Sequence, residues 1–160
     1  VLLVDLCDLF AVLVRVGGGG LISGIAGYLK HLNAEIEVTG CQPVNSAVMY
    51  HSTQAGEILD MESSPTISEG TAGGIEQGSI TFDICRNNVD DYLLVSEAEI
   101  MEALLLMMKH HYYMVEGAAG LTLAALLKNK ERYKNKNVVL VVCGNKMSLP
   151  LLKQVIALDK

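Results

Sequence analysis

Aromatic residues are scarce in this chain of 160 residues: phenylalanine, tyrosine and tryptophan make up 5%, and tryptophan is absent. Aliphatic side chains must therefore fill the core. A chain of this length is enough for one domain that buries roughly two thirds of its unfolded surface. We therefore expect residues 1–160 to form a single domain.

Positive charge is also in short supply, because 12 lysines and arginines face 18 aspartates and glutamates for a formal net charge of −6. No basic stripe runs along the sequence that could neutralise the phosphates of a strand. This excludes a nucleic-acid groove. A single phosphate group would need only a local cluster of donors.

Cysteine and histidine patterns typical of metal sites are missing. The cysteines lie far apart, with no C-x-x-C pair and no nearby histidine, and the histidines show no H-E-x-x-H arrangement. The residues concerned are Cys7, Cys41, Cys85 and Cys143, and His31, His51, His110 and His111. We expect neither a metal site nor a disulfide framework, and a reducing, cytoplasmic setting.

Long hydrophobic runs are absent as well. The longest, around residues 117–127, is too short to cross a membrane, and the start shows no charged-then-apolar signal sequence. We expect a soluble protein with no membrane partner. The chain begins at Val1 rather than at a methionine, which suggests a piece of a longer polypeptide.

Glycine, in contrast, is concentrated in one place. An apolar run at residues 12–16 leads into Gly17, Gly18, Gly19 and Gly20, and small or apolar residues follow at helical spacing. This predicts a buried strand, a tight turn and a closely packed helix. Consecutive residues without a Cβ let backbone N–H groups approach an anion in front of the helix N-terminus. A plain strand-to-helix turn is the alternative, although one or two glycines would suffice for it.

The remaining pattern alternates strands and helices. We expect strands at 11–16, 36–41, 91–95 and 138–142, and helices at 21–32, 46–55, 79–87, 97–109, 116–129 and 149–158, with a helix tail at 1–8. Ser96 and Glu99 form a capping box, and 61–78 is a long ordered loop. The predicted fold is an α/β domain of three layers, a mainly parallel twisted sheet with helices on both faces.

Ligands of such folds bind beyond the carboxyl ends of the strands, where both the glycine quartet and Gly144 fall. A dinucleotide is disfavoured, because the sixth position of G-x-G-x-x-G is Ile22 or Ser23 and no acid ends the second strand. A nucleoside triphosphate is disfavoured too, because no lysine followed by serine or threonine comes after Gly24.

Six blocks of the sequence carry a resemblance to a known family. They are residues 16–21 (VGGGGL), 40–45 (GCQPVN), 70–76 (GTAGGIE), 89–91 (VDD), 115–120 (VEGAAG) and 141–144 (VVCG). In this order they resemble the C-terminal half of the threonine/serine dehydratases, which are fold type II enzymes that use pyridoxal 5′-phosphate. The absence of a second α/β module makes the chain similar to the short, catabolic type.

The resemblance implies the following roles. Gly17 to Gly20 and the Leu21 amide would cradle the cofactor phosphate, and Cys143 would hydrogen-bond the pyridine nitrogen. Glu116 would lie beside the cofactor ring, although capping of a helix N-terminus is an equal alternative. The reaction would convert L-threonine or L-serine to a 2-oxo acid and ammonia, in a homo-oligomer when the chain is complete.

Some family features have no counterpart here. The lysine that forms a Schiff base with the cofactor lies in the family's N-terminal half, so no catalytic residue is assigned and the chain alone is expected to be inactive. Lys30 and Lys146 are poor replacements. Asn145 and Lys146 stand where Gly-Asn is usual, and Gln42 and Val48 replace the cation ligands of serine-racemase-like relatives, so no magnesium is expected. A second hypothesis is therefore a non-catalytic pseudoenzyme, or a dimerisation or regulatory domain.

Overall fold

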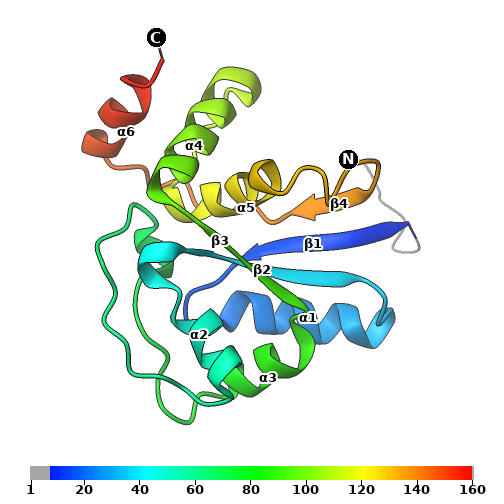
Figure 1. Cartoon of the computed structure of the whole chain (residues 1–160). Helices are drawn as coiled ribbons and strands as arrows, with labels where there is room; N and C mark the ends of the chain where they lie inside the picture. The colour runs from blue at the N-terminus through cyan, green and yellow to red at the C-terminus, as the bar shows by residue number, and fades with distance from the viewer. Residues whose placement is uncertain (1–7, 160) are drawn as a thin grey trace.

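A four-stranded parallel sheet forms the centre of the protein, in a computed structural model that describes residues 8–159 (Figure 1). The strand order is β3-β2-β1-β4. The strands are β1 (Leu9–Arg15), β2 (Glu37–Pro43), β3 (Asp91–Val95) and β4 (Asn137–Leu140). Every neighbouring pair is parallel, so all four carboxyl ends lie at one edge of the sheet.

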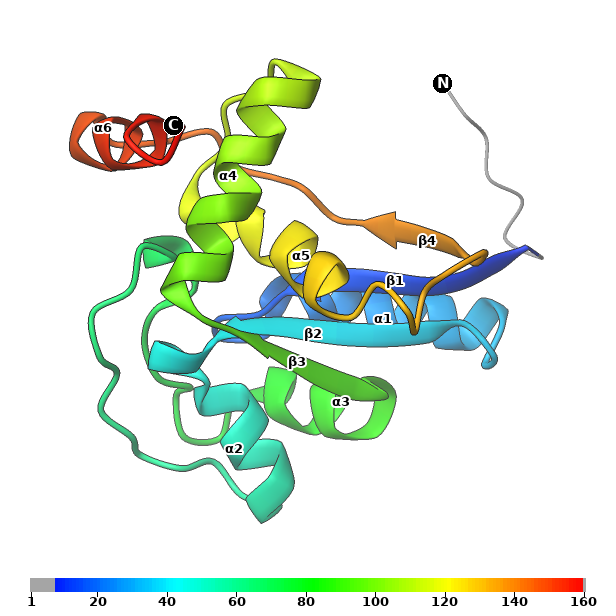
Figure 2. The same cartoon turned by 45° about the horizontal axis from the view of Figure 1, so that its top comes forward.

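Helices cover both faces of this sheet, as Figures 1 and 2 show. The helices are α1 (Gly20–Leu32), α2 (Val48–Ala55), α3 (Ile80–Asn88), α4 (Glu97–His111), α5 (Gly117–Lys128) and α6 (Leu149–Ile156), with short 3-10 turns η1 (Val44–Ser46) and η2 (Glu69–Thr71). The first three lie on one side, and α4 and α5 lie on the other. The predicted three-layer α/β fold is confirmed.

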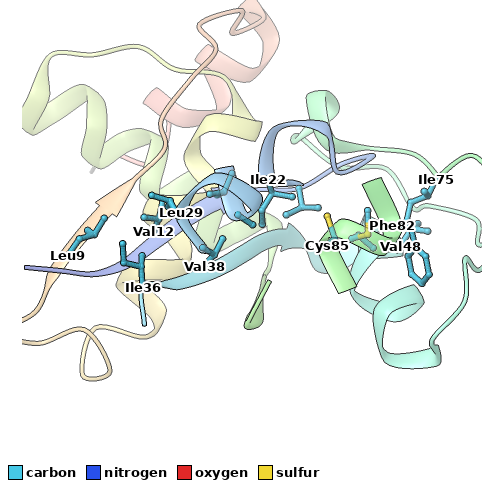
Figure 3. Packing of buried hydrophobic residues seen from close by; sticks show 14 residues of the cluster. Leu9, Val12, Ile22, Leu29, Ile36, Val38, Val48, Ile75, Phe82 and Cys85 are labelled. Carbon is cyan, nitrogen blue, oxygen red and sulfur yellow. The ribbon is translucent and has the colours of Figure 1, made fainter. Parts of the chain in front are cut away.

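The two-residue period of β1 sends alternate side chains to two separate cores. Val12, Val14 and Val16 pack toward α1, α2 and α3, in the cluster shown in Figure 3. Ala11 and Leu13 pack toward α4 and α5. Both faces of the strand are therefore apolar, which is why its sequence reads as a continuous hydrophobic run.

Glycine brings α5 close to α4 and to the long segment before α3. A Cβ on Gly120 would lie 3.0 Å from Cδ2 of Leu104, and one on Gly117 would overlap the carbonyl of Ile67. Small residues at these two points let the backbones approach each other. The N-terminus of α5 is thus held against the loop that crosses the carboxyl ends of the strands.

Two elements differ from the expected pattern. The fourth strand ends at Leu140 rather than at Val142, although the Val141 amide still donates to the Leu13 carbonyl at 3.0 Å. The helix expected at 46–55 is split into η1 and α2. The buried Gln42 side chain explains the split, because it accepts from the Tyr50 amide at 2.8 Å and donates to the Ser46 carbonyl at 3.4 Å.

The first strand begins at Leu9, two residues earlier than expected. The helix tail expected at 1–8 lies outside the described residues, apart from Asp8, which is in a turn. The other predicted elements agree with the structure to within about three residues at each end, as is usual for helix boundaries.

The long segment between α2 and α3 has no regular structure except η2, as expected, and lies beyond the carboxyl ends of the strands (left in Figure 1). Hydrogen bonds hold its middle to two other parts of the fold. The Asn45 side chain donates to the Pro65 carbonyl at 2.6 Å, and the Ile67 amide donates to Glu97 Oε2 at 2.7 Å. These contacts make it an ordered part of the fold.

The opposite edge of the sheet, at the amino ends of the strands, carries ion pairs. Lys30 Nζ lies 2.8 Å from Asp90 Oδ2, and Arg132 Nη2 lies 3.0 Å from Glu37 Oε1 while Nη1 bonds Asp91. The hydrogen bond to Asp91 is the main reason that the pKa of Arg132 is raised. These charges gather where β2 and β3 begin.

Within the described part of the chain, no helix has the length and apolar character needed to cross a membrane.

The capping box at the start of α4 is confirmed: Ser96 Oγ accepts from the Glu99 amide, and Glu99 Oε2 accepts from the Ser96 amide at 2.7 Å. We expect Ser96→Ala to lower the free energy of unfolding by about 1 kcal/mol in chemical denaturation. Ser64→Ala is the control, because Ser64 is an exposed residue of the loop before α3 and should lose clearly less. Equal losses would contradict the assignment.

Glu99 also predicts a pH effect. Partial burial opposes its ionisation, but hydrogen bonds from the Ser96 amide and hydroxyl and from Lys128 outweigh it and lower the pKa below its ordinary value of 4.5. A lowered folded-state pKa adds stability that is complete above pH 4.5 and is lost as the pH falls through the folded value. Glu99→Gln should therefore show a smaller loss of unfolding free energy on acidification than the parent.

Candidate functional site

The glycine loop follows the end of β1 and leads directly into α1. Two of its four glycines are required by the packing. Gly19 has φ +88°, and a Cβ there would lie 2.7 Å from Cε of Met49, while one on Gly17 would lie 3.1 Å from Cα of Thr71. Gly17 and Gly19 therefore fit the alternative that the glycines serve only a tight strand-to-helix turn. Gly18 and Gly20 do not, because both are exposed and a Cβ on either would meet nothing within 4 Å.

The carbonyls and the amides of this loop differ in their hydrogen bonding. Its carbonyls bond to protein: Gly18 accepts from Thr81 Oγ1 at 2.7 Å, Gly19 from the Ser23 amide at 2.9 Å, and Gly20 from Ser23 Oγ at 3.2 Å. None of the five amides of residues 17–21 donates to a protein acceptor within residues 8–159. The donors are left free for a ligand or for water.

These amides stand at the positive end of a 13-residue helix, and its first turn contains no acidic residue. No carboxylate of this turn competes with an external anion there. An array of free N–H groups at a helix N-terminus is the arrangement that binds a phosphate group. The loop therefore fits a phosphorylated cofactor.

The second part of the site lies at the N-terminus of α5. Glu116 holds the N-cap position of α5 but makes no capping bond. Its Oε2 instead accepts from the Lys146 amide at 3.3 Å, and its own amide donates to the Gly144 carbonyl at 3.3 Å. Gly144 has φ +103°, and a Cβ there would overlap the Glu116 carboxylate. The carboxylate thus needs a glycine at this position.

Cys143 and Arg15 meet in the same region, because β4 and β1 are neighbours and both have just ended. Arg15 Nε donates to Cys143 Sγ at 3.4 Å, and Arg15 Nη1 donates to the Gly70 carbonyl at 3.5 Å. Arg15 was not singled out from the sequence. The available signal was its position: it is the charged residue that ends an apolar strand, on the same face as Leu13.

A cavity of about 530 Å³ opens next to these residues. It is lined by Ile67, Glu69, Gly70, Glu116, Gly117, Ala118, Gly144, Asn145, Lys146, Ser148 and Leu151. Glu116 and the loop after β4 thus face one cavity, whereas the glycine quartet and Cys143 lie outside its lining. Asn145 and Lys146, which depart from the family pattern, are part of its wall.

The other described cysteines are free and buried. Burial raises the pKa of the Cys41 thiol well above its usual range and raises that of Cys85 to about 11. Neither is a nucleophile near neutral pH. In the part of the chain that the structure covers, no three histidine, cysteine or acidic residues gather to hold a metal ion.

A comparison with protein families now identifies the class. Residues 3–144 match the profile of the family described as "Pyridoxal-phosphate dependent enzyme". This covers most of the chain, and the chain belongs to this family. Together with the relatives and solved structures described next, this confirms the resemblance to threonine dehydratases and the fold type II architecture.

Curated relatives make the placement more specific. The chain is 36% identical over 152 residues to the L-threonine ammonia-lyase of Thermotoga maritima, covering 95% of this chain and 37% of the relative. It is 37% identical over 153 residues to the catabolic L-threonine dehydratase of Escherichia coli K12, covering 94% of this chain and 46% of the relative. The chain therefore spans less than half the length of these two relatives.

Solved structures agree. A processed threonine deaminase isoform from Solanum lycopersicum superimposes with a TM-score of 0.87 at 29% identity, over 94% of this chain and 44% of that one. A serine racemase from Dictyostelium discoideum gives a TM-score of 0.80 at 34% identity, over 89% of this chain and 45% of that one.

The free amides predict a selective effect of charge in the loop. Gly18→Asp should weaken binding of inorganic phosphate more than tenfold, measured by ³¹P NMR titration, because its carboxylate repels the anion and competes for the amides. Stability should stay within about 0.5 kcal/mol, since an acid near a helix N-terminus is tolerated.

Gly24→Asp is the matched control, because Gly24 lies one turn further along α1 in open space. It should leave phosphate binding close to that of the parent. Equal binding by the parent and Gly18→Asp would show that the loop is not the anion site.

Proposed function

We propose that this chain is the C-terminal, cofactor-holding part of a pyridoxal-phosphate-dependent dehydratase that converts L-threonine or L-serine to a 2-oxo acid and ammonia. The observation that carries the proposal is the run of five free amides at the N-terminus of α1. Membership of the family supports the choice of cofactor. A cytoplasmic location and a homo-oligomeric complete protein belong to the same proposal.

In this proposal Gly17, Gly18, Gly19 and Gly20, with the Leu21 amide, bind the cofactor phosphate. Helix α1 contributes its positive end, and Thr81 and Ser23 hold the loop carbonyls away from the anion. When bound, the cofactor supplies the electron sink for elimination of the β-hydroxyl group. The protein's part is to place and orient that group.

Cys143 and Glu116 are assigned to the ring. A neutral thiol at Cys143 donates a hydrogen bond to the pyridine nitrogen without transferring a full charge. The Glu116 carboxylate accepts from the Lys146 amide, and the backbone amide of Glu116 donates to the Gly144 carbonyl. It therefore presents a held carboxylate to the cavity rather than capping α5.

The lysines explain why no catalytic residue is assigned here. Lys30 Nζ is occupied, because it donates to the Ala34 and Ile36 carbonyls and pairs with Asp90. Lys146 lines the cavity, on the side of Glu116 rather than of the glycine loop. We propose that the Schiff-base lysine lies in the part of the relatives that this chain does not span.

The second candidate is a non-catalytic pseudoenzyme, or a dimerisation or regulatory domain. It is favoured by the larger side chains of Asn145 and Lys146 in the cavity wall. Exposed apolar side chains at the end of α4 and the start of α6 also favour an interaction role; they include Tyr112, Tyr113 and Leu149.

Activity separates the two candidates. Expressed from its complete reading frame, the protein should release ammonia and a 2-oxo acid from L-threonine or L-serine only when pyridoxal phosphate is present. Gly18→Asp should abolish this activity, and Gly24→Asp should keep it. A folded protein that binds the cofactor but turns over neither substrate would favour the pseudoenzyme.

Residues 1–160 alone give a further check. Addition of pyridoxal phosphate should produce no specific imine absorbance, and borohydride reduction should label no single lysine. Mass spectrometry that finds one stoichiometrically labelled lysine, for example Lys146, would contradict the assignment of the Schiff-base lysine to another part of the protein.

A further inference from the structure

Arg15 is an unusual residue at its position. It ends a strand whose other side chains are apolar, and the alternation along β1 sends it to the side of Leu13, under α5. It is half-buried, and no carboxylate lies within 4.0 Å of its guanidinium in the part of the chain described here. A partly buried cation without an ion-pair partner is unfavourable unless its N–H groups find other acceptors.

Its contacts point to Cys143. Arg15 Nε donates to Cys143 Sγ, so the sulfur acts as an acceptor on that side. The thiol hydrogen must then point away from Arg15, because a donated N–H and the S–H cannot share one direction. Arg15 thereby fixes the direction in which Cys143 can donate.

Other charged side chains lie near Arg15 and act on a group bound there as well. Glu116, at the N-cap of α5, has Oε1 3.2 Å from the position of a Cβ on Gly70, and Arg15 Nη1 is 3.5 Å from that position. Glu69, from η2, and Lys146, from the loop after β4, line the adjacent cavity. The two carboxylates favour a positive charge on a nearby group. The cations of Arg15 and Lys146 oppose it.

From this arrangement, and resting on the proposed function, we infer that Arg15 is a positioning residue for the cofactor ring. It directs the Cys143 thiol hydrogen toward the pyridine nitrogen, and its fixed positive charge disfavours protonation of that nitrogen. The ring nitrogen thus stays neutral, in spite of the Glu116 carboxylate.

The test uses pyridoxine 5′-phosphate, which carries the phosphate and the pyridine ring but has no aldehyde and forms no imine. Apoprotein from the complete reading frame is loaded with the compound labelled with ¹⁵N in the ring. The ¹⁵N chemical shift is followed against pH, because it reports protonation of the nitrogen itself.

Removing the charge should raise the pKa of the ring nitrogen. We expect Arg15→Met to raise it by about one unit and Arg15→Lys to stay close to the parent. Glu116→Gln should shift it in the opposite direction, since a carboxylate favours the protonated ring. Circular dichroism verifies that each variant is folded.

A second measurement places the ring beside Cys143. Bound pyridoxine 5′-phosphate should protect Cys143 from iodoacetamide, with the modified peptide identified by mass spectrometry, and protection should decrease in Arg15→Met. This readout separates Cys143 from the other cysteines and does not depend on titration.

The outcomes distinguish a failure of the role of Arg15 from a failure of the proposed function. If the compound binds and protects Cys143 but the ring pKa is the same in Arg15→Met, the role of Arg15 is overturned and the proposed function stands. An Arg15→Lys variant that matches Arg15→Met also overturns the role of charge. If the compound neither binds the parent nor protects Cys143, the proposed function itself fails.

Discussion

Free backbone amides at the start of α1 are the constraint on which the rest of the site depends. A hydrogen-bond donor without a protein partner must meet water or a ligand, because a buried orphan costs about 1–3 kcal/mol. Here the amides have no protein acceptor within residues 8–159, whereas Thr81 and Ser23 donate to the carbonyls of the same loop. The proposed anion site therefore depends on the packing of α1 and α3 as much as on the glycines.

The long segment before α3 connects this loop to the second half of the site. Thr71 lies against Gly17, and the Ile67 carbonyl lies where a side chain on Gly117 would stand. One irregular stretch thus touches the loop after β1 and the N-terminus of α5. A change in this stretch would act on the glycine loop and on Glu116 together.

Much of this architecture could be predicted from the sequence, because apolar strands and helix periods are local properties. The strand at Asp91–Val95 and the capping box at Ser96 were predicted as the structure has them. The split near Ala47 was not, since it depends on where the buried Gln42 side chain finds its partners. In the site, the glycine quartet was evident, but its required and its free members differ only in the packing around Gly17 and Gly19.

The role of Arg15 could not be predicted either, since its contact with Cys143 joins residues 128 positions apart and requires the pairing of β1 with β4. The ion pairs of Lys30, Arg132, Glu37, Asp90 and Asp91 stand at the other edge of the sheet, where β2 and β3 begin. The ion pairs and the proposed cofactor site thus lie at opposite ends of the same strands. Substitutions at the charged edge can therefore change stability without altering the residues proposed to hold the cofactor.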